Sequence, residues 1–208
     1  MIAALYFVLG FSPEWWPDRS YGRRADDAHW KLSVATGSTA ALGLMVTLSF
    51  SALRRVRTGR SGPPHQPLRR IVGLWSALVA WIHVAFGLTI HAEGLAVWRP
   101  FTNLWRSGGD LRLLAGAMWV GLGAACVLVG LAVISNTRAL RRLGVARWKW
   151  LQRSTYLVGA AVAVHVAAMQ LQEDRSRPHV VVTIAVVTAF LVLEGLGVRA
   201  VVRERRRF

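Results

Sequence analysis

The chain of 208 residues is 54% hydrophobic and only 17% charged, and its mean hydropathy is +0.38. This composition excludes an ordinary soluble domain, in which about a quarter of the residues are charged. The net charge of +16 is concentrated in short clusters between long apolar runs. That pattern suits anionic lipid headgroups and argues against nucleic acid as a partner. The single cysteine, Cys126, excludes an intrachain disulfide and a cysteine metal cluster.

In chain order, the sequence predicts about six membrane-spanning helices, because each crossing needs about 20 mostly apolar residues. Residues 1–11 are apolar but reach only about half that length. They are either a short or truncated first span or a surface segment, and they lack the basic start of a signal peptide. The longer expected spans are residues 34–53, 71–90, 113–134, 154–172 and 180–198. We therefore expect an all-α integral membrane bundle, with residues 1–208 forming one transmembrane domain.

Basic residues between the spans predict how the chain is oriented. Residues 54–70 hold six arginines, and residues 136–153 hold five arginines and one lysine; neither segment contains an acidic residue. Residues 199–208 add five arginines and one glutamate, whereas the other connections mix acids with bases. Cytoplasmic loops carry the excess of Lys and Arg. All three basic segments lie inside if the chain crosses six times with both termini cytoplasmic, which predicts a multi-pass protein of the inner or plasma membrane.

Two histidines, His83 and His165, lie well inside apolar spans. Each follows an arginine at the basic start of its span, Arg70 for His83 and Arg153 for His165, and the two separations differ by a single residue. At the rise of about 1.5 Å per residue of an α-helix, both histidines lie about 18–20 Å from the basic side. Two imidazoles at the same depth can bind one haem iron from opposite faces. The alternative is a pair of neutral histidines hydrogen-bonded to neighbouring helices, and their matched depth favours the cofactor.

The remaining histidines carry weaker signals. His91 follows His83 by eight residues, so it lies about 12 Å further along the helix axis and is turned by about 80°. It falls at the outer edge of the bundle, as do His29 and His179. These edge histidines either line a quinone or metal site or are simply solvated, and solvation is the usual state.

Three stretches resemble a known family. They are RRIVGLWSALVAWIH at residues 69–83, the basic loop and span of residues 131–170, and the pair Thr36-Gly37 followed by SALRRV. They resemble the ferric-reductase-like transmembrane family, and most closely its MsrQ/YedZ type, the haem-binding membrane subunits of periplasmic methionine-sulfoxide reductase systems. The resemblance covers residues 30–172. It implies six helices, b-type haem and membrane electron transfer, with quinone or FMN as further candidate cofactors.

One position departs from the family pattern. The family has histidine where this chain has Gln152, which precedes His165 by about 20 Å along the helix axis. In two-haem relatives that position binds the haem nearer the cytoplasm. Glutamine is a poor haem ligand, and Arg69 and Arg70 occupy the corresponding end of the third span. The resemblance therefore implies one haem, held by His83 and His165, with His91 and Gln152 as secondary candidates.

Two functions remain open from sequence. The first is an electron-transfer subunit that receives electrons from quinol or a cytoplasmic flavin reductase and passes them to a redox partner on the outer face. The second is a haem-free scaffold or assembly subunit descended from such a cytochrome, which the loss of histidine at Gln152 favours. The sequence has no G-x-G-x-x-G motif, and we expect no flavin or nicotinamide domain. The protein is thus expected to be a subunit of an oxidoreductase system rather than a complete enzyme.

Overall fold

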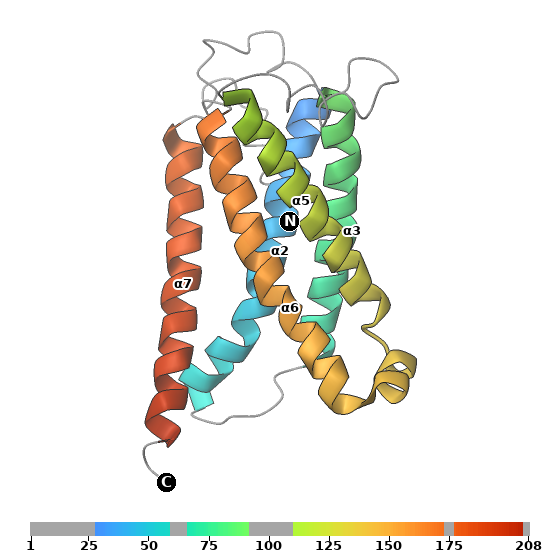
Figure 1. The fold of residues 1–208 in the computed structure, drawn as a ribbon. Helices are drawn as coiled ribbons and strands as arrows, with labels where there is room; N and C mark the ends of the chain where they lie inside the picture. Colours follow the sequence, from blue (N-terminus) through green and yellow to red (C-terminus); the bar gives the residue numbers. More distant parts are fainter. Residues whose placement is uncertain (1–27, 59–65, 92–109, 173–176, 206–208) are drawn as a thin grey trace.

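The structure, a computed structural model, describes residues 28–58, 66–91, 110–172 and 177–205. These residues form α2 (Ala28–Thr58), α3 (Gln66–His91), α5 (Asp110–Val133), α6 (Thr137–Gln172) and α7 (Arg177–Arg205) (Figure 1). The all-α prediction is confirmed for this part of the chain. Each of the 5 helices is long and apolar enough to cross a membrane. The short first span expected at residues 1–11 lies outside the described residues.

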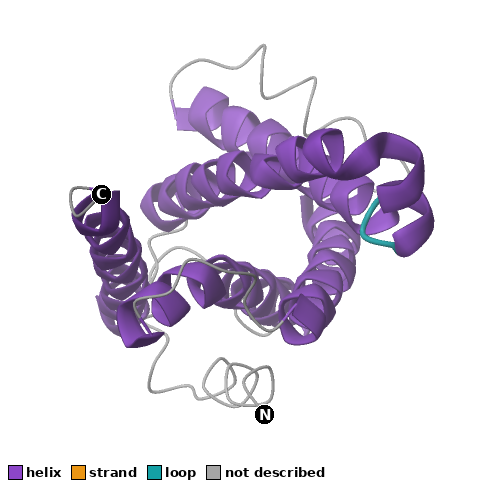
Figure 2. Cartoon of the chain, turned by 90° about the horizontal axis from the view of Figure 1, so that it is seen from below, coloured by secondary structure: helices purple, strands orange, loops and turns teal. Residues whose placement is uncertain are grey.

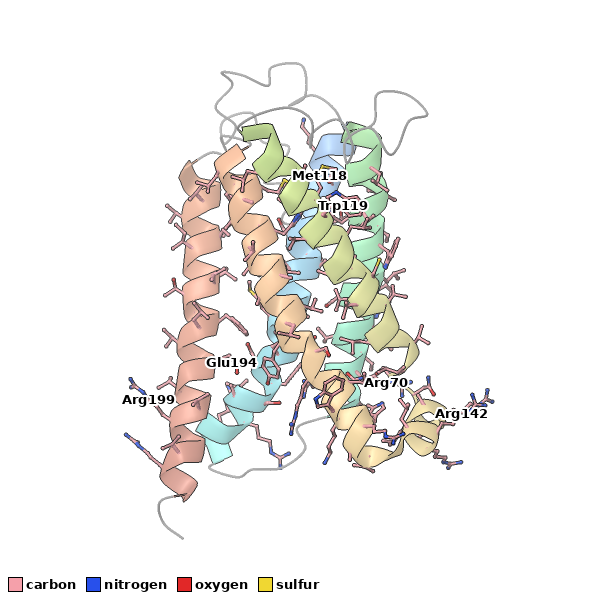
Figure 3. All side chains as sticks on the ribbon, in the orientation of Figure 1. Arg70, Met118, Trp119, Arg142, Glu194 and Arg199 are labelled. Carbon is pink, nitrogen blue, oxygen red and sulfur yellow. The ribbon has the colours of Figure 1, made fainter. Side chains whose placement is uncertain are left out.

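The outward surface of the bundle is apolar. Leu157 and Leu171 of α6 are 73% and 75% exposed, and Val181 and Leu191 of α7 are 63% and 60% exposed. Exposing such apolar side chains on every helix to water would be energetically unfavourable, whereas contact with lipid is favourable. Arginine side chains gather at one end instead, where Arg70, Arg142 and Arg199 lie near the ends of three different helices (Figure 3). We call this the basic end of the bundle.

The helices run side by side around a shared interior (Figure 2). Helix α2 packs against α3, α6 and α7, while α5 packs against α3 and α6. Helices α2, α3, α5 and α6 therefore enclose the centre, and α7 covers the outside of α2. Helices α3 and α6 both start at the basic end, so their side chains at equal distance from that end lie at the same level (Figure 1).

The segment 136–153, expected to be an inter-helix loop, is largely helical. Helix α6 begins at Thr137, and the Asn136 side chain accepts a hydrogen bond from the Ala139 amide at 2.8 Å, which satisfies the helix start. Gly144 then interrupts the helix with φ 72° and ψ 158°, a left-handed φ that glycine adopts without steric cost. Arginine has good helix propensity, so a basic stretch outside the apolar zone forms a helix as readily as a loop.

The half of the interior nearer the basic end is tightly packed. Its core comprises Ala40, Leu44, Leu48, Ala77, Ala80, Ala124, Leu128, Leu131 and Val158. Leu48 is 1% exposed and Val158 is 2% exposed, so neither side chain borders an open space. Four helices contribute to this core, which holds the bundle together below the site described next.

Candidate functional site

A cavity lies between α2, α3, α5 and α6, above the packed core. Its volume is ≈ 160 Å³, roughly ten times what a single buried water requires. Many of the residues around it have small side chains, which leave unfilled the space that larger residues would occupy. These small lining residues include Ala40, Ala41, Ala80, Gly87, Ala124 and Ala125. The cavity is therefore a built feature of the bundle interior and is predominantly apolar.

His83 of α3 and His165 of α6 face each other across this cavity. Their ring centroids are 6.2 Å apart, and the ring planes are inclined at 74°. Both histidines line the cavity and both are half-buried. The structure thus brings together the two residues that the spacing of the sequence places at equal depth.

His83 is anchored on α2. Its Nδ1 lies 2.8 Å from the backbone carbonyl of Ser33 and 3.3 Å from the Ser33 hydroxyl. Its ring packs directly on Gly37, where an added Cβ would lie 2.8 Å from Cε1 and 2.9 Å from Nδ1. Only a residue without a Cβ leaves room for the imidazole at this level. Gly37 is therefore part of the site through the space it leaves.

His165 is anchored on α5 in the same way. Its Nδ1 lies 2.7 Å from the carbonyl of Ala117. A Cβ added at Gly121 would lie 2.7 Å from Nδ1 and 2.8 Å from Cε1. In both anchors the accepting carbonyl is four residues before the glycine. Ser33 and Ala117 were not singled out from sequence, because a backbone acceptor leaves no residue-type signal.

These anchors define the chemistry of the two rings. A carbonyl oxygen accepts hydrogen bonds and cannot donate them, so each Nδ1 carries the proton. In a neutral imidazole the lone pair then belongs to Nε2, and such orienting partners are typical of metal-binding histidines. A bond between an imidazole nitrogen and a metal is about 2.0 Å long, and the centre of the ring lies about 1.1 Å behind that nitrogen. Two imidazoles that bind one metal from opposite sides therefore have ring centroids about 6 Å apart. The observed 6.2 Å fits one metal between the two rings.

Of the two secondary candidates, the structure places only the Gln152 side chain, and it lies outside this site. Gln152 does not line the cavity; its Nε2 approaches the carbonyl of Leu131 at 3.5 Å, next to the packed core. His91 is the last residue of α3, and its side chain lies outside what the structure describes, as do those of His29 and His179. Among the described residues, no group of three or more His, Cys, Asp or Glu is placed to hold a metal ion.

Comparisons with known proteins concern the chain as a whole. No family model matches the chain. It is 30% identical over 173 residues to the "Protein-methionine-sulfoxide reductase heme-binding subunit MsrQ" of Bordetella pertussis, covering 79% of this chain and 74% of the relative. The MsrQ of Deinococcus radiodurans is 28% identical over 163 residues, covering 78% and 71%.

A second kind of relative is the "Magnetosome protein MamZ" of Magnetospirillum gryphiswaldense. It is 27% identical over 144 residues, which make up 69% of this chain but only 20% of that protein. The likeness therefore concerns one part of a much longer protein. The MsrQ relatives, in contrast, are matched over most of their length. Together with the five apolar helices, this match identifies a multi-pass membrane protein that belongs to the MsrQ family of heme-binding subunits.

Proposed function

We propose that this protein is a membrane electron-transfer subunit that binds one haem b through His83 and His165. The observation that carries the proposal is the pair of imidazoles, 6.2 Å apart across an apolar cavity, each with its Nδ1 held by a backbone carbonyl. The MsrQ relatives are named heme-binding subunits, and the spacing of the two rings suits that group. A porphyrin is flat and largely apolar, and the small residues around the cavity suit both properties.

The residues of this chain have definable roles in such a site. A bound haem supplies a centre that gains and loses one electron. The carbonyls of Ser33 and Ala117 hold both rings in one tautomer and make Nε2 a better electron donor. Gly37 and Gly121 let the rings approach α2 and α5 closely enough for these contacts. The apolar wall excludes water, which keeps the surroundings of the redox centre at low dielectric.

A single haem per chain is part of this proposal. The second haem of two-haem relatives would need a ligand near Gln152, and glutamine is a poor one. The neighbouring interior is filled by Leu48, Leu131 and Val158. Binding another haem there would require displacing well-packed core side chains, at a cost of several kcal/mol.

The electron path that we propose assumes one orientation of the bundle in the membrane. We infer that the basic end faces the cytoplasm, because positive residues favour that side. Electrons would then come from quinol or a cytoplasmic flavin reductase and leave to a redox partner on the outer face. The chain would cross six times, with residues 1–11 as the first span and both termini inside. Residues 1–208 would form one transmembrane domain of the inner or plasma membrane.

The test is the haem content and reduced-minus-oxidised spectrum of the purified protein and its variants. His83→Ala and His165→Ala should each abolish or severely reduce bound haem, because each variant would keep only one of the two imidazoles that would hold it. His91→Ala and His179→Ala are the matched controls and should leave the spectrum unchanged. Ordinary haem content and a low-spin spectrum in the His83→Ala, His165→Ala double variant would refute the ligand assignment.

The second candidate, a haem-free scaffold or assembly subunit, is favoured by one observation: glutamine at position 152. It makes the opposite prediction in the same experiment. Wild-type protein prepared with excess haem would then show no spectrum that depends on His83 or His165.

A further inference from the structure

Two helical hairpins contribute corresponding residues to the wall of the cavity. Each α5 residue that lines the cavity can be paired with an α2 residue that also lines it. The two members of every pair are as far apart in the sequence as Gly37 and Gly121. Identical pairs in this register include Gly37 and Gly121, Ala41 and Ala125, and Leu44 and Leu128. The lining residues of α3 and α6 form pairs in the same way, and the members of every pair are as far apart in the sequence as His83 and His165. The hairpins α2–α3 and α5–α6 therefore surround the cavity as a structural repeat, which the sequence alone does not make clear.

The repeat is broken at one informative position. Leu88 of α3 corresponds to Gln170 of α6, and both line the cavity. Gln170 lies five residues beyond His165, or about 7.5 Å further from the basic end. In the opposite direction the walls are apolar, with Leu44 and Leu128 as the floor. The α5–α6 hairpin thus places a long polar side chain at the side of the cavity that is farther from the basic end of the bundle. The α2–α3 hairpin has a leucine at the corresponding position.

In the Gln170 side-chain amide, the nitrogen has a hydrogen-bond partner and the oxygen has none among the described residues. Its Nε2 donates a hydrogen bond to the Thr183 hydroxyl of α7 at 3.2 Å. Its Oε1 is buried and has no hydrogen-bond partner among the described residues, which is unfavourable for a polar atom shielded from water. Rotation of the side-chain amide exchanges its oxygen and its nitrogen, and which of the two faces Thr183 is set by the hydrogen bonds available to both. When the oxygen faces Thr183, an N–H donor takes the unsatisfied position.

We propose that Gln170 is a positioning residue whose amide hydrogen-bonds a carboxylate of the haem and so directs the carboxylate edge away from the basic end. This inference rests on the proposed function, because it requires haem between His83 and His165. A haem b molecule has one apolar edge and one edge with two carboxylates. The apolar floor of the cavity suits the first edge, and Gln170 suits the second. Helix α7 then acts on the site through Thr183, which fixes the amide.

The test compares haem with its dimethyl ester, in which both carboxylates are blocked. Full-length protein without haem is titrated in detergent with each compound, and binding is followed by the Soret band. Wild-type protein should bind haem roughly 10-fold or more tightly than the ester, because a hydrogen bond to a charged group contributes about 1.5–3 kcal/mol. Gln170→Leu should lose this preference while keeping the low-spin spectrum of the two histidines. Gln170→Glu places a like charge there and should prefer the ester.

Leu88→Ala is the matched control at the corresponding position of the other hairpin. It should weaken both compounds equally and leave their ratio unchanged. Thr183→Val should lower the ratio, because the amide loses its anchor. A wild-type preference for haem in Gln170→Leu would overturn the inference while leaving the proposed function intact. Failure of wild-type protein to bind either compound with a spectrum that depends on His83 and His165 would instead refute the proposed function, and the inference with it.

Discussion

Gly121→Ala is the substitution that most directly tests the anchored-histidine site. The added methyl group would lie 2.7 Å from His165 Nδ1 and 2.8 Å from Cε1. The ring would have to retreat by roughly 0.7 Å to restore the 3.4 Å of an ordinary van der Waals contact. That movement lengthens the hydrogen bond to Ala117, now 2.7 Å, and turns Nε2 away from the metal position. Disturbing the orienting partner of a metal-binding histidine typically costs about 10–100-fold in affinity.

The structure supplies a matched control in the same helix. A Cβ added at Gly123 or Gly116 meets nothing within 4 Å, so Gly123→Ala and Gly116→Ala should bind haem as the wild type does. All three substitutions raise intrinsic helix propensity by about 1 kcal/mol. A loss confined to Gly121→Ala therefore reports the imidazole contact and not helix stability. The assay is a haem titration of the haem-free protein, with circular dichroism to verify helix content. Wild-type affinity in Gly121→Ala would refute the reasoning.

Three further predictions follow from the same geometry. Ser33→Ala should change haem affinity by less than about threefold, because the nearer partner of His83 is the backbone carbonyl at 2.8 Å and the hydroxyl lies at 3.3 Å; a loss of about 10-fold or more, as expected for a disturbed orienting partner, would contradict it. A pyridine haemochrome assay should give one haem per chain, since Gln152 lies beside a packed core; two haems would reject the single-site proposal. In a Cys126→Ser background, a cysteine at Ser61 should resist an impermeant thiol reagent added from outside, and one at Gly108 should react; the reverse pattern would invert the topology.

The sequence by itself determined the helical membrane architecture and the level of the two histidines. Apolar runs of about 20 residues have few stable forms in lipid other than helices. The fixed rise per residue then converts the distances from Arg70 to His83 and from Arg153 to His165 into nearly equal depths. The sequence prediction was wrong for residues 136–153, which form mostly helix, because charge alone does not distinguish a polar helix from a loop.

Only the tertiary structure decided what surrounds those histidines. The contacts of Ser33, Gly37, Ala117 and Gly121 with the two rings depend on which helices are neighbours and how they are rotated, and no periodicity in one helix reports that. The correspondence between Leu88 and Gln170 appears only when the two hairpins are compared around one cavity. The packed core beside Gln152 likewise results from side chains of four helices meeting. The position of a residue along its helix follows from the sequence, whereas packing between helices sets the partners it meets.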